Sequence, residues 1–563
     1  MIITIRKPYF VNKDRKYGDV DKMSEELEKK EIDTEDMEER FSFPAFCEEA
    51  VSLLLMAYLF IMFCLYPFYM QNGYMEIGNV KYNFYKAVTI GAFALIIPLA
   101  LLCTIFRVRE HIKNKETETV RRHVRISLTD AAVLIYGISV IISYICTEFK
   151  EDAFWGERGW NMGLVTQLLF VISYFLISRF WEYEGKLLLA YMAAASVVFL
   201  LGILNRFSIF PIEIQGANSS FLSTLGNINW YCGYWAVLFP IGFIMYWCTD
   251  WLWLRLIGLL YTIIGIATGV SQGSNSAFIV FAGLYVFIFC FSFKNLARMK
   301  RIFELAMLFC ITCQGLRLWR ILQPDAFDYY DGTLSDWITL SRVTLYILIP
   351  IGVIYALLCL AGRKKNMDIG RYKMLRQIAI LVVTITVGVY IFLLVLNSKT
   401  EGGIRFMGEI PALVFSKQWG SSRGATWSAG MEVYRNMHGI KKLTGVGPDC
   451  FAMYLYTIPD LAKRMIKQFD GARLTNAHNE WLTVLVNNGI SGFISYAGIF
   501  ISSIFRYIYY GEKGFADRKK YLYIFAISAF AYMIHNVVSF QQILSTPFMF
   551  LMLGMGERLV REE

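Results

Sequence analysis

Long apolar windows recur along this chain, separated by polar segments that carry most of its charges. A helix needs about 20 apolar residues to cross the hydrocarbon core of a bilayer. The windows are continuous rather than alternating, which favours helices over the strands of a barrel. The pattern predicts an all-α integral membrane protein with about fourteen transmembrane helices, which cover 46–68, 85–106, 128–147, 162–178, 187–204, 230–247, 253–270, 276–293, 302–319, 343–361, 377–396, 482–505, 521–539 and 543–559.

The composition of the chain excludes a soluble multidomain protein. Of its 563 residues, 56% are hydrophobic and only 18% are charged, whereas soluble domains carry about 25% charged residues. The same composition excludes disorder as the dominant state. Eleven cysteines in a chain of this length are too few for a secreted disulfide scaffold.

Lys and Arg are unevenly distributed between the two sets of loops. With the N-terminus placed inside, the cytoplasmic loops and their edges carry 25 basic residues, and the short outside loops carry six. Cytoplasmic loops are normally the richer in Lys and Arg. We therefore expect a multi-pass protein of the cell membrane with both termini in the cytoplasm.

Four regions follow from this topology. We expect a charged cytoplasmic tail over 1–45, a bundle of about eleven spans over 46–397, an extracytoplasmic loop over 398–481, and about three further spans with a short cytoplasmic tail over 482–563. The N-terminal tail is either a docking arm or a solvated segment. Loops as long as 398–481 are often functional, so this loop is the first place to look for a site.

The 398–481 loop combines helical apolar patterns with an excess of positive charge. It carries eleven basic and seven acidic residues, which indicates an anionic substrate or lipid headgroup, unless the loop is simply long enough to escape the charge bias. Two apolar repeats at helical spacing predict surface helices, the first of them over about 426–438. They are Trp427, Met431, Tyr434 and His438, and then Leu461, Met465 and Phe469.

Several candidate catalytic residues lie where this loop enters the next predicted span. His478 lies at the start of a predicted helix, with Asn479 and Glu480 beside it. The free amides of a helix N-terminus favour phosphate, and histidine is suited to proton transfer near neutral pH. In the alternative interpretation, His478 is an interfacial side chain, Asn479 caps the helix, and Glu480 is an acidic first-turn residue favoured by the helix dipole.

Arg423 precedes the predicted helix at 426–438, and its guanidinium could bind diphosphate oxygens in a bidentate manner. It could equally bind lipid headgroups. The Gly445-Val446-Gly447-Pro448 turn has no Lys and Ser/Thr of a P-loop, so its glycines are better explained by backbone geometry. No metal-binding motif is present, and we expect neither a metal nor another cofactor.

Several short motifs occur in a fixed order along 220–555. They are Leu225-Gly226-Asn227-Ile228-Asn229-Trp230, Ser422-Arg423 with Trp427, His438, Gly445-Val446-Gly447-Pro448 with Phe451, Ala477-His478-Asn479-Glu480, and Asn488-Gly489-Ile490. In order, spacing and placement in a long outer loop, this set resembles the O-antigen ligase / O-antigen polymerase superfamily. Each motif alone is weak, and together they are fairly specific.

The resemblance implies a metal-independent membrane glycosyltransferase of GT-C-like architecture. Such an enzyme moves a glycan from undecaprenyl diphosphate to an acceptor hydroxyl, on a glycan or lipid-glycan, at the outer face of the bilayer. By matching position, Arg423 would contact the diphosphate, and His478 would activate the acceptor hydroxyl or bind the leaving group, with Glu480 as a further catalytic candidate. The candidates for substrate binding are Asn479, Asn229, Asn275, Arg473 and His438. No nucleic acid partner is expected.

One departure from the family pattern concerns the Ser271–Ser276 segment, where Asn275 stands at the position of a family Arg. Either another cation replaces that Arg or this chain has altered activity; the candidates are Arg206, Arg320, Arg342 and Arg473. The sequence does not separate a surface-polysaccharide polymerase from a ligase. The alternative function is a polysaccharide or lipid transporter, which would be expected to have charged residues in its spans and inverted repeats.

Overall fold

The computed structural model describes residues 43–114, 125–327, 333–363, 372–399, 413–514 and 518–561. The predicted N-terminal tail therefore lies outside the described residues, except for its last few, which begin α2. The helices of the bundle are α2 (Phe43–Phe60) with its continuations η1 (Ile61–Leu65) and η2 (Tyr66–Phe68), α3 (Ile77–Asn114), α5 (Leu128–Cys146), α7 (Leu164–Phe180), α8 (Gly185–Arg206), α9 (Ile228–Leu238), α10 (Pro240–Cys248), α11 (Leu252–Ser271), α12 (Ser276–Ser292), α13 (Leu296–Leu322), α15 (Val343–Ala361), α16 (Tyr372–Lys399), α21 (Glu480–Lys513), α22 (Leu522–His535) and α23 (Thr546–Arg561).

The remaining elements are short or lie at the ends of the bundle. They are α6 (Lys150–Trp155), a two-stranded antiparallel sheet of β1 (Phe221–Leu222) and β2 (Gly226–Asn227), η3 (Pro324–Ala326), α14 (Leu334–Leu340), α17 (Trp419–Asn436), α18 (Lys441–Thr444), α19 (Phe451–Leu455), α20 (Pro459–Gln468) and η6 (Arg518–Tyr521).

The structure confirms an all-α, multi-pass membrane architecture. Every predicted span overlaps a helix, but only ten helices in the described part of the chain are long and apolar enough to cross a membrane. The expected count of fourteen is thus not confirmed. The helices at the last two predicted spans, α22 and α23, have only 14 and 16 residues. They are buried by their neighbours, so tertiary packing supports them.

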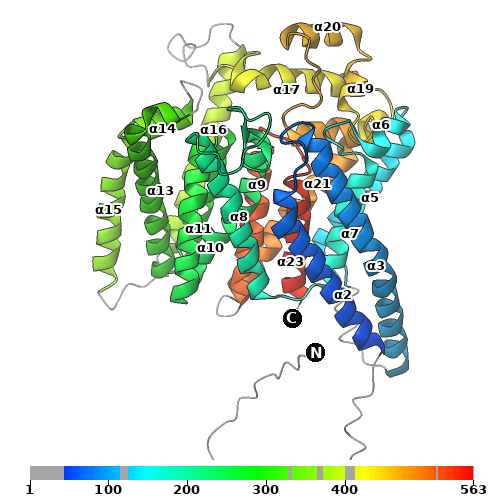
Figure 1. The fold of residues 1–563 in the computed structure, drawn as a ribbon, viewed down its shortest axis with the longest axis horizontal. Helices are drawn as coiled ribbons and strands as arrows, with labels where there is room; N and C mark the ends of the chain where they lie inside the picture. The colour runs from blue at the N-terminus through cyan, green and yellow to red at the C-terminus, as the bar shows by residue number, and fades with distance from the viewer. Residues whose placement is uncertain are drawn as a thin grey trace, which may run out of the picture.

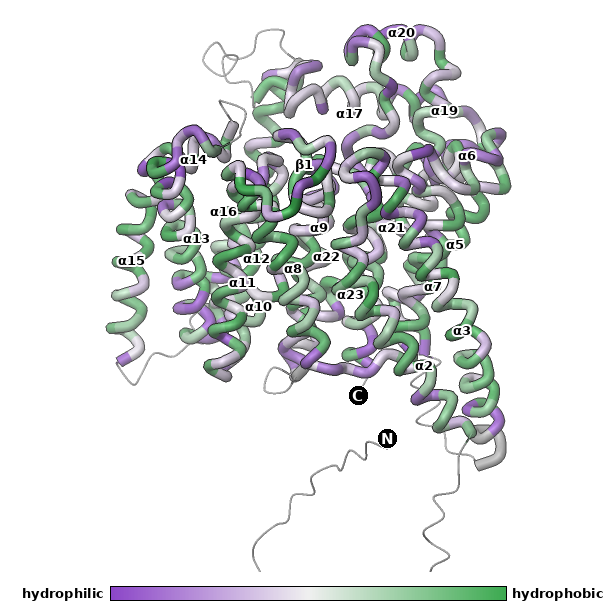
Figure 2. The backbone as a smooth tube through the Cα atoms, in the orientation of Figure 1, coloured by the Kyte–Doolittle hydropathy of each residue, from purple (hydrophilic) through white to green (hydrophobic). Residues whose placement is uncertain are grey.

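The bundle has a buried centre and an exposed margin, and α15 lies at one edge of it (Figure 1). The α9–α10 segment lies wholly inside, with 100% of its apolar window buried, while the corresponding share is 6% for α15 and 0% for α16. Around the centre, α21 packs against α5 and α22, and α23 packs against α7. Figure 2 shows the hydrophobic stretches of these helices side by side in one broad band, which matches a bilayer-embedded layer.

A separate layer covers one end of the bundle (Figure 1). We call residues 413–479, which include α17 to α20, the cap. The cap has its own small core, which includes Val433, Phe451, Leu455, Leu461 and Met465. The predicted second repeat is therefore confirmed for its two buried members, Leu461 and Met465.

The first predicted cap helix ends earlier than expected, and its buried face is not the apolar repeat. Residues 420–422 have left-handed φ and ψ angles, so regular helix begins at Arg423, and α17 ends at Asn436, before His438. The buried face consists of small residues such as Gly424, Ala429 and Gly430. Because small side chains let α17 lie close to α21, the predicted larger residues are displaced to the outer side: Trp427 is half-buried and Met431 is exposed.

Two glycines join the cap to α21. Gly489 has φ 67° and ψ −170° inside α21, which bends the helix there. A Cβ at Gly489 would lie 2.3 Å from the carbonyl oxygen of Leu443, and one at Gly445 would lie 2.1 Å from that of Asn487. This close approach lets Gly447 N donate to Asn487 O at 3.0 Å. The backbone-geometry interpretation of the Gly445–Pro448 turn is confirmed, because Gly445 and Gly447 have φ of 81° and 123°.

Candidate functional site

A buried, non-helical loop at 536–545 lies at the centre of the candidate site. Sequence analysis predicted spans over 521–539 and 543–559, but α22 ends at His535 and α23 begins at Thr546. Non-helical backbone at membrane depth is tolerated only where protein or water surrounds it, and the loop is mostly buried by protein. Its apolar residues hide this break in the hydropathy pattern.

Four of the predicted site residues contact this loop. Arg423 Nε donates to the carbonyl oxygen of Val538 at 2.9 Å, and the ring of His478 packs edge-on against Phe540, with 5.2 Å between ring centroids. The carboxylate Oε2 of Glu480 accepts the backbone N–H of Gln541 at 2.6 Å. The carbonyl oxygen of Asn229 accepts from Gln542 Nε2 at 3.3 Å. The loop thus contacts α9, α17 and α21, and the segment that precedes α21.

Arg423 is the half-buried cation of the site. Its Nη1 donates to Gly420 O at 2.8 Å, while Nη2 has no hydrogen-bond partner in the described part of the protein. Arg423 also forms no ion pair with any described carboxylate. Burial lowers the pKa of the guanidinium, but an arginine stays charged at neutral pH. The site therefore holds a positive charge that is not neutralised by a described side chain.

His478 lies next to this cation. Thr426 Oγ1 donates to Ala477 O at 2.8 Å, which ties the first turn of α17 to the segment that carries His478. His478 itself has φ 49°, and its backbone N–H donates to Asn476 Oδ1 at 2.9 Å. Burial, and secondly the charge of Arg423, lower the pKa of His478 to about 4. The imidazole is therefore neutral at pH 7, and its Nδ1 is buried without a described hydrogen-bond partner.

Asn479 and Glu480 form the N-terminus of α21, Asn479 as the N-cap and Glu480 as an acidic residue of the first turn. Asn479 is the N-cap of α21, and its Oδ1 accepts from Leu482 N at 3.1 Å, so the capping interpretation is confirmed. Glu480 is 3% exposed and follows the cap residue directly. Its carboxylate lines a cavity of about 30 Å³ together with Gln167, Asp449 and Gln541. Such a cavity holds about one water molecule.

Asp449 is a residue that sequence analysis did not single out. Its Oδ2 accepts the backbone N–H groups of Glu157 and Met162 at 2.8 and 2.9 Å, so it ties the 156–163 loop to the cap. Burial, and more weakly the negative charge of Glu157, raise the pKa of Asp449 to about 7. The residues that Asp449 contacts lie far away in the sequence. The only feature of the sequence that could have pointed to Asp449 was therefore its position directly after the Gly445–Pro448 turn.

Asn229 contacts both the 536–545 loop and Ser274, the neighbour of Asn275 in the sequence. Asn229 Oδ1 accepts from Ser274 Oγ at 2.9 Å, whereas Asn275 is exposed at the start of α12. The same segment is held by Arg206, which donates to Ser271 O, Gln272 O and Ser219 O at 3.0, 2.8 and 3.2 Å. Arg206 is fully buried and supports the Ser271–Ser276 segment.

The other predicted cations and His438 do not join this cluster. Arg320 forms an ion pair with Asp336 at 2.6 Å, and Arg473 forms one with Glu157 at 3.2 Å. Arg342 is exposed at the start of α15. His438 is exposed beyond the end of α17, and the helix between Arg423 and this end is roughly 20 Å long.

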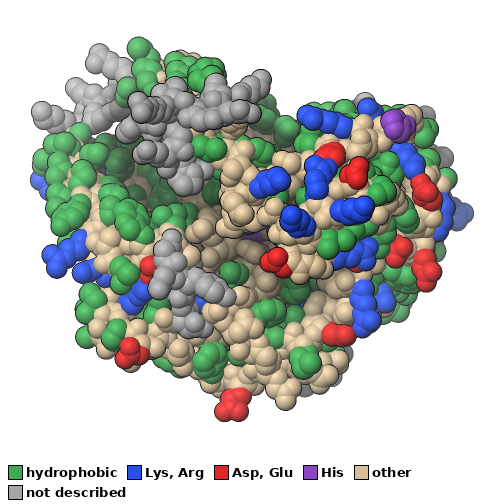
Figure 3. Space-filling model, turned by 90° about the horizontal axis from the view of Figure 1, so that it is seen from above, with side chains coloured by type: hydrophobic (Ala, Val, Ile, Leu, Met, Phe, Trp, Pro, Cys, Tyr) green, Lys and Arg blue, Asp and Glu red, His purple; other side chains and the backbone are tan. Residues whose placement is uncertain are grey.

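An open apolar groove runs beside the cluster. It has a volume of about 660 Å³, and its lining includes Trp427 and Met431 of α17 and Leu482, Leu485 and Phe493 of α21. Asn479 also lines it, which brings the groove next to His478. The displaced apolar face of α17 is thus one wall of this groove. Figure 3 views this end of the molecule and shows Lys and Arg side chains, interspersed with acidic ones, over the region of the cap.

In the described ranges, no group of three or more His, Cys, Asp or Glu side chains could hold a metal ion. Comparison with known proteins adds no assignment to the geometry: no protein-family model matches this chain, and no curated protein matches it.

Proposed function

We propose that this protein is a membrane glycosyltransferase that moves a glycan from a polyisoprenoid diphosphate to an acceptor hydroxyl, as in polymerisation or ligation of a surface polysaccharide. The observation that carries the proposal is the meeting of Arg423 and His478 beneath the cap, where no described carboxylate neutralises the arginine. On the charge bias of the loops we place the cap on the extracytoplasmic side.

The donor's diphosphate fits the positive side of the cluster. Arg423 Nη2 has no described partner, and a guanidinium with free N–H groups binds phosphate oxygens strongly. The N-terminus of α21 adds a partial positive charge beside it. These groups would stabilise the charge that develops on the diphosphate as it leaves, which is usually the largest catalytic contribution.

The donor's lipid chain fits the open groove. A polyisoprenoid is a long apolar chain, and the groove between α17 and α21 is lined by apolar side chains and has room for part of such a chain. Because Asn479 lines the groove and precedes α21 directly, a lipid lying there would place its diphosphate close to Arg423 and His478.

The proposed reaction is a direct displacement at the anomeric carbon. The acceptor oxygen forms a bond to that carbon, the bond from the carbon to the diphosphate oxygen breaks, and the acceptor proton moves to His478. His478 can accept this proton because its low pKa keeps the imidazole neutral. A bound diphosphate raises that pKa, since nearby negative charge favours the protonated ring.

The test uses purified full-length protein in lipid nanodiscs with an undecaprenyl-diphosphate glycan. Released undecaprenyl diphosphate together with lengthened glycan supports transfer, whereas passage of intact donor across a liposome membrane without release supports the transporter alternative. Arg423→Gln and His478→Gln should each lower transfer at least 100-fold, since one lost charge-stabilising group costs about 10²–10³ in rate.

The matched control is Lys463→Gln, which removes an exposed positive charge on α20 of the same cap. It should leave transfer within twofold of the unmodified protein. Normal transfer by both the Arg423 and His478 variants would refute the assignment of this cluster as the active site.

A further inference from the structure

A second polar cluster lies at the other end of α21. Arg506 lies 26 residues beyond Glu480, which corresponds to about 39 Å measured along the axis of α21, a helix that bends at Gly489. A bilayer with its headgroup regions is about 40–45 Å thick. The cluster therefore lies near the opposite membrane interface, far from the Arg423–His478 site.

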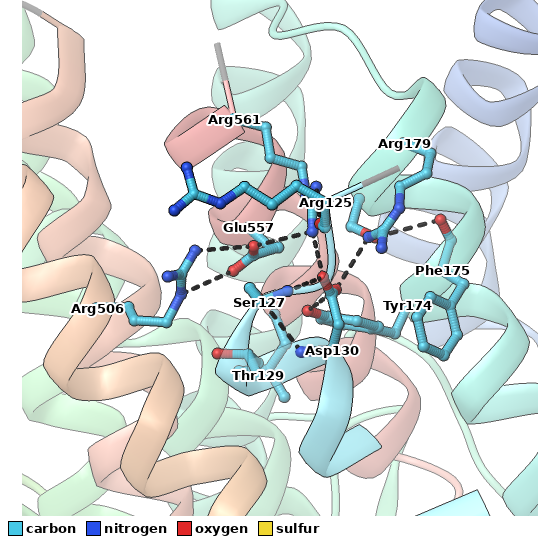
Figure 4. A network of polar contacts seen from close by, with 12 residues as sticks. Arg125, Ser127, Thr129, Asp130, Tyr174, Phe175, Arg179, Arg506, Glu557 and Arg561 are labelled. Atoms are coloured by element: carbon cyan, nitrogen blue, oxygen red, sulfur yellow. Dashed lines mark hydrogen bonds and ion pairs between the residues drawn. The ribbon is translucent and has the colours of Figure 1, made fainter. Parts of the chain in front are cut away.

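Two buried carboxylates form the core of this cluster (Figure 4). Asp130 accepts from Arg179 Nη1 at 3.0 Å and also pairs with Arg561. Glu557 accepts from Arg506 Nη2 at 3.0 Å and lies 3.3 Å from Arg561 Nη2. The carboxylates are 1% and 0% exposed, so each is satisfied by guanidinium groups rather than by water.

Arg125 adds positive charge that these carboxylates do not balance. Its carbonyl oxygen accepts from Arg561 Nη1 at 2.9 Å, and its exposed side chain forms no ion pair with a described residue. Three guanidinium groups, those of Arg179, Arg506 and Arg561, pair with the two carboxylates, and Arg125 adds a fourth positive charge beside them. Excess positive charge near a membrane interface attracts anionic groups from the surrounding lipid.

A pocket of about 540 Å³ opens beside this charge. Its lining includes the three arginines Arg125, Arg506 and Arg561, with Glu557 as its acidic member. Two further lining residues, Ile126 and Leu128, are 65% and 74% exposed. The pocket thus combines a cationic wall with an apolar rim at the level where a lipid's headgroup meets its acyl chains.

We propose that this pocket binds the headgroup of an anionic phospholipid from the leaflet opposite the cap. The phosphate would lie against Arg125 and the outer face of Arg506, and the acyl chains would lie over Ile126 and Leu128. The apolar rim selects a lipid over free phosphate, and the excess charge selects an anionic over a zwitterionic lipid. The proposal is independent of glycan transfer.

The test measures phospholipid binding to the delipidated full-length protein by native mass spectrometry, together with its thermal stability in detergent. Phosphatidylglycerol should bind at least tenfold more tightly than phosphatidylcholine with the same acyl chains and should raise the unfolding temperature. Arg125→Gln should weaken phosphatidylglycerol binding about tenfold, because one charge-assisted hydrogen bond is lost. Arg363→Gln, which removes an exposed charge at the end of α15, should leave binding unchanged.

A second variant tests the proposal even if Arg125→Gln fails to fold. Ala131→Phe fills the pocket without changing any charge, and it should reduce phosphatidylglycerol binding to the phosphatidylcholine level. Full phosphatidylglycerol binding by both folded variants would overturn the proposal. Equal binding of the two lipids, or the same stabilisation by inorganic phosphate alone, would overturn it as well.

Discussion

Replacement of Gly489 by Ala tests the joint between the cap and α21, by which we mean the close backbone contact of residues 443–447 with residues 486–489. The φ of 67° and ψ of −170° at this position belong to a region that is essentially restricted to glycine. A Cβ there would lie 2.3 Å from Leu443 O and 2.6 Å from Gly445 N. Both atoms are backbone, so the clash cannot be relieved by rotating a side chain.

The expected cost has two parts. An alanine in this backbone conformation costs about 1–3 kcal/mol. Displacing the 443–447 segment also weakens the hydrogen bonds from Val446 N to Val486 O at 3.1 Å and from Gly447 N to Asn487 O at 3.0 Å, each of which contributes about 0.5–1.5 kcal/mol. Together these give roughly 2–6 kcal/mol of lost stability, concentrated at the joint rather than in the membrane bundle.

Limited trypsin digestion measures this loss, because Lys441 and Lys442 stand at the joint. If opening is fast relative to cleavage, a loss of roughly 2–6 kcal/mol raises cleavage there at least 30-fold. The control is Gly388→Ala in α16, where an added Cβ meets nothing within 4 Å; it should not change cleavage. Equal protection of both variants would refute the reasoning that Gly489 holds the cap in place.

Three further predictions concern single side chains. Arg206→Lys should lower stability by about 2–4 kcal/mol in thermal unfolding, because an ammonium cannot reproduce the guanidinium's fork toward three carbonyls; an effect no larger than that of exposed Arg158→Lys would contradict the buried clamp. If His478 accepts the proton, the acid limb of kcat/KM should lie near its pKa of about 4, and a limb near pH 6.5 would show that the free imidazole is neither buried nor close to a cation. The folded-state pKa of Asp449, about 7, is above its ordinary value of 3.8, so its contribution to stability is present below pH 3.8 and is lost as the pH rises to about 7. Asp449→Asn should therefore gain stability relative to the unmodified protein between pH 5 and pH 8, and parallel unfolding temperatures across this range would contradict the shift.

The sequence predicted the membrane helices well because hydropathy over about 20 residues reflects the thickness of the bilayer. It failed at 536–545, where Phe540, Ile543 and Leu544 are apolar enough to continue a span but are buried inside the protein as part of a loop. Hydropathy does not distinguish residues that face lipid from residues that face other helices.

The candidate site was predicted in part. Arg423 and His478 were identified from their position beside a helix N-terminus, and the structure places them close together. Asp449 was missed because its role depends on contact with the 156–163 loop, nearly 300 residues earlier in the chain. The buried face of α17 was not predicted, because small residues such as Gly430 can be the buried side of a helix when close backbone approach matters more than apolar area.

The exposure of α15 and α16 means that lipid, rather than neighbouring side chains, is the main environment of these two helices. The side chains of these helices need only be apolar, and the helices need only be long enough to match the thickness of the membrane. Few neighbouring side chains require a particular side-chain shape at a given position. Leu, Ile, Val and Phe should therefore exchange freely along them. The sequences of these two helices should therefore vary widely during evolution. The helices α9, α10 and α22 are enclosed by protein, so their side chains should vary much less.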